Sequence, residues 1–184
     1  MIYIFCAPSG SGKSTMVRHL LETFPNTFEL SVSCTTRPPR GQEINGREYY
    51  FVTPDVFRKH IAADDFIEYE QVYAGLYYGT LKSEISRIEG NGHAVLFDVD
   101  VKGGMNLKRI LGDRTVSVFI CPPSIDCLRA RLVGRGDTSA EMIEQRLAKA
   151  SLEMQDRIHF DHIIVNDNLQ HAFKELDELV QRYL

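Results

Sequence analysis

Runs of strand length in which apolar residues predominate recur along the chain, and polar or amphipathic segments separate them. The runs cover Ile2–Cys6, 94–99, Thr115–Cys121 and His162–Val165. Strands that are buried on both faces have this pattern, because their side chains on both sides of the sheet are mainly apolar. Runs of this kind that alternate with helices predict an α/β fold, in which a parallel sheet carries helices on both faces.

The segments between the runs carry helical patterns with recognisable starts. The expected helices cover 16–23, 54–63, 80–89, 124–132, 139–154 and 169–183. Thr53 followed by Pro54 is typical of an N-cap with proline at the first helical position. Thr80 is expected to cap the helix 80–89, which Gly90 and Gly92 then stop.

Residues 33–92 break the alternation of strands and helices. Strands are expected at 31–35 and 66–72. We expect a short hairpin over 43–52, because Asn45 followed by Gly46 suits a type I′ turn. This stretch therefore predicts an inserted subdomain, within a chain whose 184 residues form one domain by length.

The loop after the first strand carries the strongest chemical signal. Gly10, Gly12, Lys13 and Ser14 end a glycine-rich segment between a predicted strand and a predicted helix. Glycines let backbone N–H groups turn inward, the helix start adds positive charge, lysine binds outer phosphates and serine binds Mg²⁺. Ala7 stands where the phosphate-binding motif has glycine, which requires a negative φ there. The segment predicts a nucleoside triphosphate site made by Ser9, Gly10, Ser11, Gly12, Lys13, Ser14 and Thr15.

Composition narrows the range of partners and the compartment. A formal net charge of −4 gives no global field for nucleic acid or a membrane surface, and no apolar run approaches a membrane span. The chain opens directly on its first strand, so we expect no signal peptide. The four cysteines show no CxxC spacing, which favours a cytoplasmic protein with reduced thiols.

Two pairs of charged residues suit phosphate chemistry. Arg37 and Arg40 lie three apart in a proline-stiffened loop, so both can reach one phosphate. Asp98 and Asp100 end a buried strand, at the edge of a parallel sheet where ligands bind. Transfer between two phosphates needs no general base, because the attacking oxygen is already anionic, but it needs positioning and cations.

Several short motifs together resemble those of the guanylate kinases. They are S-C-T-T-R-P-P-R at 33–40, N-G-R-E-Y-Y-F at 45–51, F-I-E at 66–68, Y-G-T at 78–80, D-V-D at 98–100, G-R-G at 134–136 and V-N-D at 165–167. They follow the family's order at nearly its spacing, and the resemblance covers essentially the whole chain. It implies transfer of the γ-phosphoryl group of ATP, the co-substrate, to GMP and also to dGMP, with Mg²⁺ as cofactor.

The resemblance also implies a division of the chain and of its residues. The core would be 1–32, 93–123 and 157–184, the GMP-binding subdomain about 33–92 and the lid about 124–156. Catalytic charge would come from Lys13, Arg40, Arg135 and Arg146. Arg131 and Asn166 would join the glycine-rich loop in binding ATP, with Asn166 at the adenine edge. GMP would be bound by Ser33, Arg37, Arg40, Tyr49, Glu68, Tyr78, Thr80, Asp98 and Asp100. Mg²⁺ would be held by Ser14 and, through water, by Asp98.

Glu68 is the residue expected to read the base. Guanine offers two adjacent donors, N1–H and the 2-amino group, which one carboxylate accepts in parallel, whereas adenine has an acceptor at N1. A site whose polar groups are left unpaired by the wrong base discriminates by roughly 10⁴–10⁵. Ser33 and Thr80 carry hydroxyls that can donate to guanine O6. The chain is one residue longer than most relatives just before the Tyr-Gly pair, so Tyr77 is the alternative to Tyr78.

Two functions from other classes stay open. Guanylate-kinase-like scaffold modules bind peptides and have lost phosphate chemistry, whereas this chain keeps the lysine and arginines of phosphoryl transfer. A P-loop kinase for a phosphorylated sugar should lack the residues aimed at guanine. We therefore expect the small molecules GMP and ATP as partners, with no nucleic acid and no membrane, and a monomer or homodimer.

Overall fold

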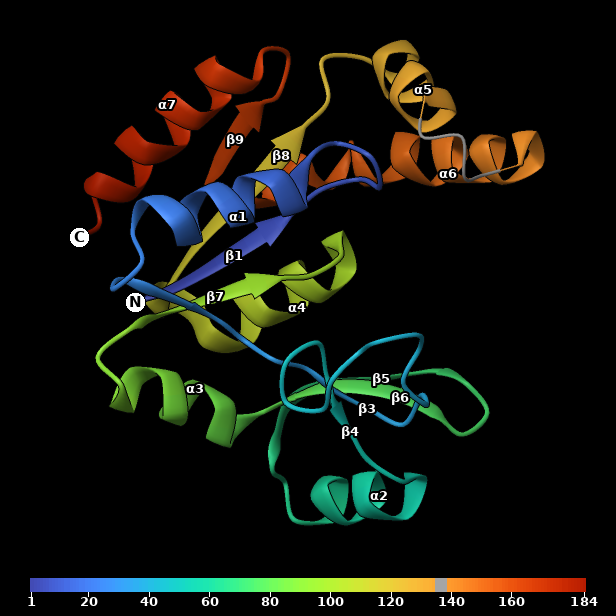
Figure 1. The fold of residues 1–184 in the computed structure, drawn as a ribbon, viewed down its shortest axis with the longest axis vertical. Coiled ribbons are helices and arrows are strands. Elements are labelled where there is room, and N and C mark those ends of the chain that lie inside the picture. Colours follow the sequence, from blue (N-terminus) through green and yellow to red (C-terminus); the bar gives the residue numbers. More distant parts are fainter. Residues whose placement is uncertain (135–138) are drawn as a thin grey trace. The chain divides into compact units, whose positions relative to one another are not determined.

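In the computed structural model, which describes residues 1–134 and 139–184, the chain divides into two compact units. The first consists of Met1–Phe28 and Leu96–Leu184, and the second of Glu29–Val95. Both boundaries fall inside strands, namely β2 (Phe28–Leu30) and β7 (Ala94–Asp98). Figure 1 shows the order of the elements along the chain.

A five-stranded sheet has the strand order β2-β7-β1-β8-β9. Within the first unit, β1 (Ile2–Cys6), β8 (Thr115–Cys121) and β9 (His162–Val165) pair in parallel. All three strands have the predicted bounds. Because β1 is buried along its whole length, the loop that follows it starts from a fixed position in the sheet.

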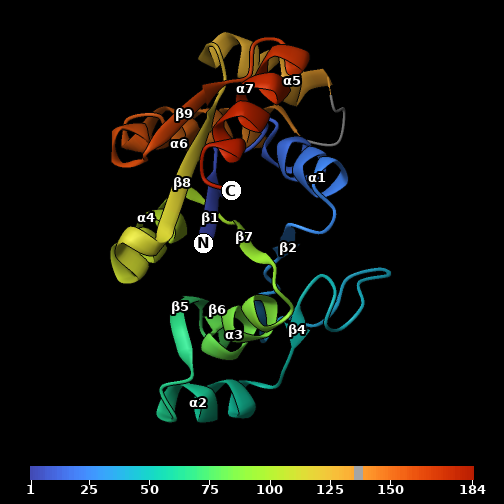
Figure 2. The ribbon, with the colours of Figure 1, turned by 90° about the vertical axis from the view of Figure 1, so that its left-hand side faces the viewer.

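Helices cover both faces of the parallel sheet, as the alternating pattern predicts. The helices of the first unit are α1 (Lys13–Thr23), α4 (Val101–Leu111), α5 (Ile125–Gly134), α6 (Ala140–Glu153) and α7 (Leu169–Gln181), with short 3₁₀ turns at Gly112–Arg114 and Asp156–His159. Figure 2 shows α1 and α4 on opposite sides of β1 and β8. α4 packs on those two strands, and α1 contacts α7.

The helix α4 is an element that the sequence pattern does not predict. Its Gly103 and Gly104 suggest a turn, but Asp100 caps a helix there by accepting a hydrogen bond from the N–H of Gly103 at 2.8 Å. A Cβ at Gly104 would lie 2.0 Å from the sulfur of Cys6. The glycine therefore permits close contact between the helix and β1.

The second unit is built on a four-stranded sheet with the order β4-β3-β6-β5. Its elements are β3 (Cys34–Thr35), β4 (Tyr50–Phe51), α2 (Pro54–Ala62), β5 (Phe66–Tyr73), β6 (Leu76–Leu81) and α3 (Lys82–Gly90). α2 begins as predicted, because the Thr53 hydroxyl accepts a hydrogen bond from the N–H of Val56. Phe57 and Phe66 are buried together with Cys34, which holds α2 on the sheet.

The predicted hairpin over 43–52 is wrong. Asn45 and Tyr49 share a single bridge, and β4 instead pairs in parallel with β3. Gly46 has the positive φ of 82° that the turn signal suggests. The side chain of Asn45, however, accepts a hydrogen bond from the N–H of Phe51 at 2.8 Å, so the segment closes into a loop.

The predicted capping of a helix by Thr80 is also wrong. Thr80 lies in β6, directly opposite Glu68 of β5. α3 starts only after Leu81, and no side chain of the described residues caps it. The strand continues because antiparallel pairing with β5 satisfies the backbone on both sides of Thr80.

In the part of the chain that the structure describes, no helix is long and apolar enough to cross a membrane. Cys6, Cys34 and Cys121 are buried free thiols. Burial raises the pKa of Cys34 to about 11, so this thiol stays protonated at neutral pH. These cysteines act as small apolar side chains of the core.

Candidate active site

The loop between β1 and α1 has the conformation of a phosphate cradle. Gly10 and Gly12 have φ values of 95° and 98°, which glycine adopts without strain. Asp64 is the one described non-glycine residue with a positive φ, so Ala7 meets the condition that its side chain imposes. No side chain of the described residues caps α1, which leaves N–H groups of its first turn available to an anion. A cavity of about 200 Å³ is lined by Ala7, Pro8, Ser9, Gly10, Gly12, Lys13, Ser14 and Thr15.

Arg131 and Asn166 hold this loop through the carbonyl of Ser11. The side-chain amide of Asn166 donates to that carbonyl at 2.8 Å, and Arg131 donates to it at 3.5 Å. Arg131 also donates to the backbone carbonyl of Asn166 at 2.7 Å. A Cβ at Gly12 would lie 2.3 Å from the amide nitrogen of Asn166, so only glycine fits. The structure thus brings Arg131 and Asn166 to the loop between β1 and α1, where they hold its backbone.

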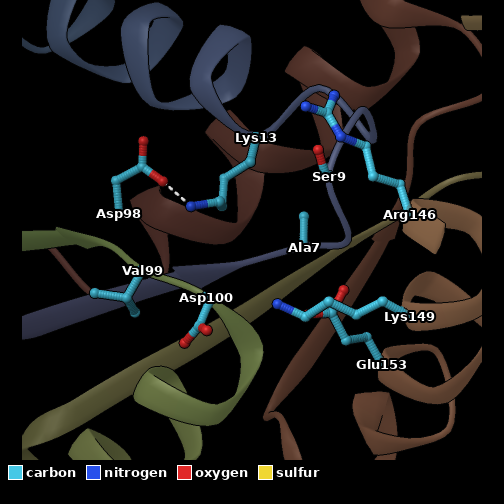
Figure 3. A pocket seen from close by; sticks show the side chains of 9 residues that line it. All are labelled: Ala7, Ser9, Lys13, Asp98, Val99, Asp100, Arg146, Lys149 and Glu153. Carbon is cyan, nitrogen blue, oxygen red and sulfur yellow. Dashed lines mark hydrogen bonds and ion pairs between the residues drawn. The ribbon is translucent and has the colours of Figure 1, made fainter. Parts of the chain in front are cut away.

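Lys13 is paired with a carboxylate at the end of β7. Its ammonium donates to Asp98, and the two side chains are 19% and 25% exposed. Figure 3 shows this pair beside the loop that carries Ala7 and Ser9. The lysine is thus neutralised within the chain while it remains accessible to a stronger anion.

Asp100 lies two residues beyond Asp98 but does different work. One of its carboxylate oxygens caps α4, and its backbone carbonyl accepts a hydrogen bond from the thiol of Cys6 at 3.3 Å. The side chain remains exposed and lines the same cavity as Lys13. The sequence places the two aspartates at the end of one strand, but in the structure Asp98 pairs with Lys13 whereas Asp100 caps α4.

Packing between α5 and α6 turns one polar face of α6 toward this cavity. Leu128 and Leu132 of α5 pack against Ile143, Leu147 and Ala150 of α6. Arg146 lies beside this buried face of α6, and its guanidinium points toward the loop in Figure 3. The cavity measures about 250 Å³ and is lined by Ala7, Ser9, Lys13, Asp98, Val99, Asp100, Arg146, Lys149 and Glu153. Arg135, the other predicted lid arginine, lies outside the described residues.

In the second unit, Arg37 is held as a preformed fork. Its two terminal nitrogens each donate to one carboxylate oxygen of Glu43 at 2.9 Å. The guanidinium lies 5.3 Å from the ring centre of Tyr49, and the side chain is only 8% exposed. The hydrogen bonds from Arg37 and from the backbone N–H of Arg40 hold the pKa of Glu43 below its usual value. A planar fork held in this way matches the geometry of a phosphate.

The same cluster distinguishes between two neighbouring tyrosines. The ring of Tyr78 lies 5.9 Å from that of Tyr49, and the Tyr78 hydroxyl accepts a hydrogen bond from the Arg37 guanidinium. Tyr77 instead stacks on Phe57 in the apolar core beneath the sheet. Since successive strand residues point to opposite faces, only Tyr78 shares the face of the arginine.

Glu68 and Thr80 form a pair across β5 and β6. The Thr80 hydroxyl donates to Glu68 at 2.9 Å, and Thr80 is fully buried. A hydroxyl has one hydrogen, so in this conformation Thr80 does not also donate to a base. Ser33 immediately precedes β3, and its backbone carbonyl accepts from the N–H of Tyr50 at 2.9 Å. In this structure the Thr80 hydroxyl is therefore engaged with the Glu68 carboxylate.

Three residues at these sites are missed by sequence reasoning. Glu43 follows Arg40 by three residues, a spacing that suits the closure of a tight loop on a carboxylate. Lys149 and Glu153 follow Arg146 by three and seven residues, which places all three on one side of a helix. That helical spacing is the signal that could have found them.

Comparisons with known proteins agree with this geometry. A profile of the family described as guanylate kinase matches residues 1–183. A guanylate kinase from Bacteroides fragilis is 49% identical over 183 residues, covering 97% of this chain and 89% of that protein. One from Porphyromonas gingivalis is 46% identical and covers 100% of this chain and 97% of its own length. A solved guanylate kinase from Anaplasma phagocytophilum shares the fold, with a TM-score of 0.71 at 24% identity over 100% of this chain and 85% of that chain.

Proposed function

The chain belongs to the guanylate kinase family, and from this premise we propose how its residues divide the work of the reaction. The activity is the ATP-dependent phosphorylation of GMP, which gives GDP and ADP. The observation that carries the division is the cavity that joins Lys13, Asp98 and Arg146 within one unit. The arginine fork and the Glu68 pair both lie in the other unit.

On the ATP side, the glycine-rich loop binds the phosphate chain through backbone N–H groups and Lys13. The loop residues Ser9, Gly10, Ser11, Gly12, Ser14 and Thr15 surround the phosphates. Arg131 and Asn166 support ATP binding by holding the Ser11 carbonyl, as their hydrogen bonds indicate. Lys13 exchanges Asp98 for the outer phosphates, where its charge offsets the charge that develops during transfer.

The residues present fit the Mg²⁺ that the family implies. Ser14 supplies a hydroxyl and Asp98 a carboxylate, and hard oxygen ligands are those that Mg²⁺ prefers. No cluster of three His, Cys, Asp or Glu side chains occurs among residues 1–134 and 139–184. Ser14 would hold the ion directly and Asp98 through water, with the substrate phosphates as its other ligands. When bound, Mg²⁺ supplies neutralisation of the phosphate charge.

On the GMP side, Arg37, Arg40, Tyr49 and Tyr78 bind the phosphate, and Glu68 and Ser33 bind the base. The carboxylate of Glu68 accepts from N1–H and the 2-amino group of guanine, and Thr80 keeps it oriented. Ser33 donates to O6. We also assign Asp98 and Asp100 to the binding of GMP, and this assignment rests on the resemblance to the family alone. Arg40 also neutralises charge on the phosphoryl group in transfer.

The lid is the helix pair within about 124–156. Arg146 brings its guanidinium to the transferring phosphoryl group, and Arg135 is proposed to join it from outside the described residues. The remaining chain divides into a core of 1–32, 93–123 and 157–184 and a GMP-binding subdomain of about 33–92. Helix packing through Leu147 supports the placement of Arg146.

We also propose a compartment for the enzyme and a second acceptor substrate. We place the enzyme in the cytoplasm, in line with the buried free thiols of Cys6, Cys34 and Cys121. It would accept dGMP as well as GMP and work as a monomer or homodimer.

A coupled assay of ADP release tests the proposed function. The purified chain is given ATP and Mg²⁺ with GMP, dGMP, AMP or ribose 5-phosphate as acceptor. We expect turnover with GMP that exceeds turnover with AMP by about 10⁴-fold, because Glu68 is repelled by the N1 acceptor of adenine. Equal rates with GMP and AMP would refute the assignment of Glu68, and a preference for the sugar phosphate would favour the P-loop sugar kinase.

A further inference from the structure

The polar face of α6 contributes more to the cavity than the arginine assigned to phosphoryl transfer. Arg146, Lys149 and Glu153 all line it, at helical intervals of three and four residues. Their orientation is set by the buried face of the same helix, where Ile143 and Leu147 pack on α5. Because the packing of α6 on α5 determines which side of α6 lines the cavity, it also brings Lys149 to the cavity.

Lys149 and Glu153 form an ion pair inside this face. The Lys149 ammonium lies 3.3 Å from a carboxylate oxygen of Glu153, and the side chains are 64% and 13% exposed. Figure 3 shows the lysine extended from α6 into the cavity, with its nitrogen directed toward Asp100. The anchored carboxylate thus holds a flexible cation at the mouth of the site.

The charges that line the cavity balance. Lys13, Arg146 and Lys149 are cations, and Asp98, Asp100 and Glu153 are carboxylates. Lys13 is paired with Asp98 and Lys149 with Glu153 in the same manner. A phosphate chain brings more negative charge than the carboxylates that it replaces, so it attracts every cation that is free to turn toward it.

We propose that Lys149 is a further phosphate-binding residue, which contacts a phosphoryl oxygen of the bound nucleotide and which Glu153 positions. This inference rests on the proposed function, since it assigns the ligand of the cavity as a nucleotide phosphate chain. Lys149 acts as a point charge beside the forked charge of Arg146. Glu153 is a positioning residue that acts through Lys149.

The first test replaces Lys149 by Met, which keeps the apolar stem and removes the charge. We expect kcat/KM to fall about tenfold, the effect of one charged hydrogen bond reduced by exposure to solvent. Lys149→Arg should retain activity within about threefold of the wild type, because it restores the charge. Lys174→Met is the matched control, since Lys174 forms an exposed pair with Glu178 on α7 at the same spacing of four residues.

Binding of inorganic tripolyphosphate, measured by calorimetry, separates a phosphate contact from a structural role. Lys149→Met should weaken binding about tenfold and reduce its dependence on salt, whereas the control variant should change neither. Equal tripolyphosphate affinity in wild type and Lys149→Met would overturn the proposal. If the wild type phosphorylates GMP and the variant does so equally well, the inference fails while the proposed function stands.

A double-mutant cycle tests the part assigned to Glu153. Glu153→Gln should lower kcat/KM by about threefold in the wild type and produce no further loss in the Lys149→Met background. An undiminished loss in that background would show that Glu153 acts on something other than Lys149. Thermal unfolding of each variant confirms that the fold is intact.

Discussion

In each of the two units, the cation proposed to bind phosphate is neutralised by a carboxylate of the same unit. In the first unit Lys13 is a point charge on a flexible stem, paired with a partly exposed Asp98. In the second unit Arg37 is a rigid fork, nearly buried, clamped by Glu43 and covered by Tyr49. We propose that the first site, where no described side chain caps α1, binds phosphate mainly through backbone N–H groups, and that the second binds it through side chains.

This difference corresponds to the tasks of the two sites. A phosphate chain whose terminal group leaves needs a cation that can move with the charge, and lysine has three rotatable donors for this purpose. A phosphate that must stay in place as the acceptor is better held by a planar, preorganised fork. We infer that replacing Lys13 should act mainly on kcat, whereas replacing Arg37 should act mainly on the use of GMP.

Replacing Lys13 by Ala should have the largest effect on turnover of all the substitutions considered. We expect kcat to fall by about 10³-fold or more, because the charge on the transferring phosphoryl group loses its nearest cation. GMP affinity, measured by titration, should change little. Near-normal turnover in this variant would contradict the assignment of the loop.

Arg146→Ala, in the proposed lid, should produce the next largest loss of kcat. A single arginine in phosphoryl transfer contributes on the order of 10²–10⁴ in kcat. Arg129→Ala is the control, since Arg129 is exposed and pairs with Glu144 between the two helices. A variant of Arg146 that loses only GMP affinity would place this arginine on the acceptor.

Glu68→Gln tests whether this carboxylate of the second unit recognises the guanine base. The new amide places a donor opposite the donors of guanine, which costs about 1.5–3 kcal/mol, or about ten- to two-hundredfold in kcat/KM for GMP. Any residual AMP phosphorylation should hold steady or rise, as the amide can donate to adenine N1. Unchanged kinetics with GMP would show that Glu68 does not read the base.

The smallest effect is expected for Glu84→Gln, which tests how the second unit is preorganised. Glu84 is 2% exposed, and it accepts from the N–H of Val32, from Tyr50 and from Arg87. Burial alone would raise its pKa, but the hydrogen bonds led by Arg87 outweigh burial and keep the pKa below its usual value. The variant should lose about 1–2 kcal/mol of unfolding free energy at pH 7.

The sign of the pH dependence follows from that lowered pKa. The stability that ionised Glu84 contributes is present above its ordinary pKa and is lost as pH falls through the lower folded value. Thermal unfolding of wild type and Glu84→Gln should therefore differ at pH 7 and converge in acid. A difference that stays constant down to pH 3 would show that ionisation of Glu84 does not stabilise the unit.

Local patterns in the sequence predict the parts of the fold that local forces determine. β1, β8 and β9 are predominantly apolar runs, and α2 has both its cap and its first-turn proline. The errors occur where a distant contact decides. Asp100 caps α4 and Gly104 permits close packing of that helix on Cys6, and Thr80 stays in a strand because β5 pairs with it.

The candidate site shows the same limit. Motifs predict which residues bring charge, but not which carboxylate neutralises each cation before substrate arrives. The pairing of Arg37 with Glu43, the hydrogen bond from Thr80 to Glu68 and the face shared by Arg146 and Lys149 all depend on packing. The choice between Tyr77 and Tyr78 likewise depends on the register of β6, which a single sequence leaves open.

The most direct test of the division between the units is equilibrium titration of the wild type, Lys13→Ala and Glu68→Gln with each substrate alone. We expect Lys13→Ala to weaken ATP binding and to leave GMP binding intact, and Glu68→Gln to weaken GMP binding and to leave ATP binding intact. Either variant weakening both substrates to the same extent would contradict this division.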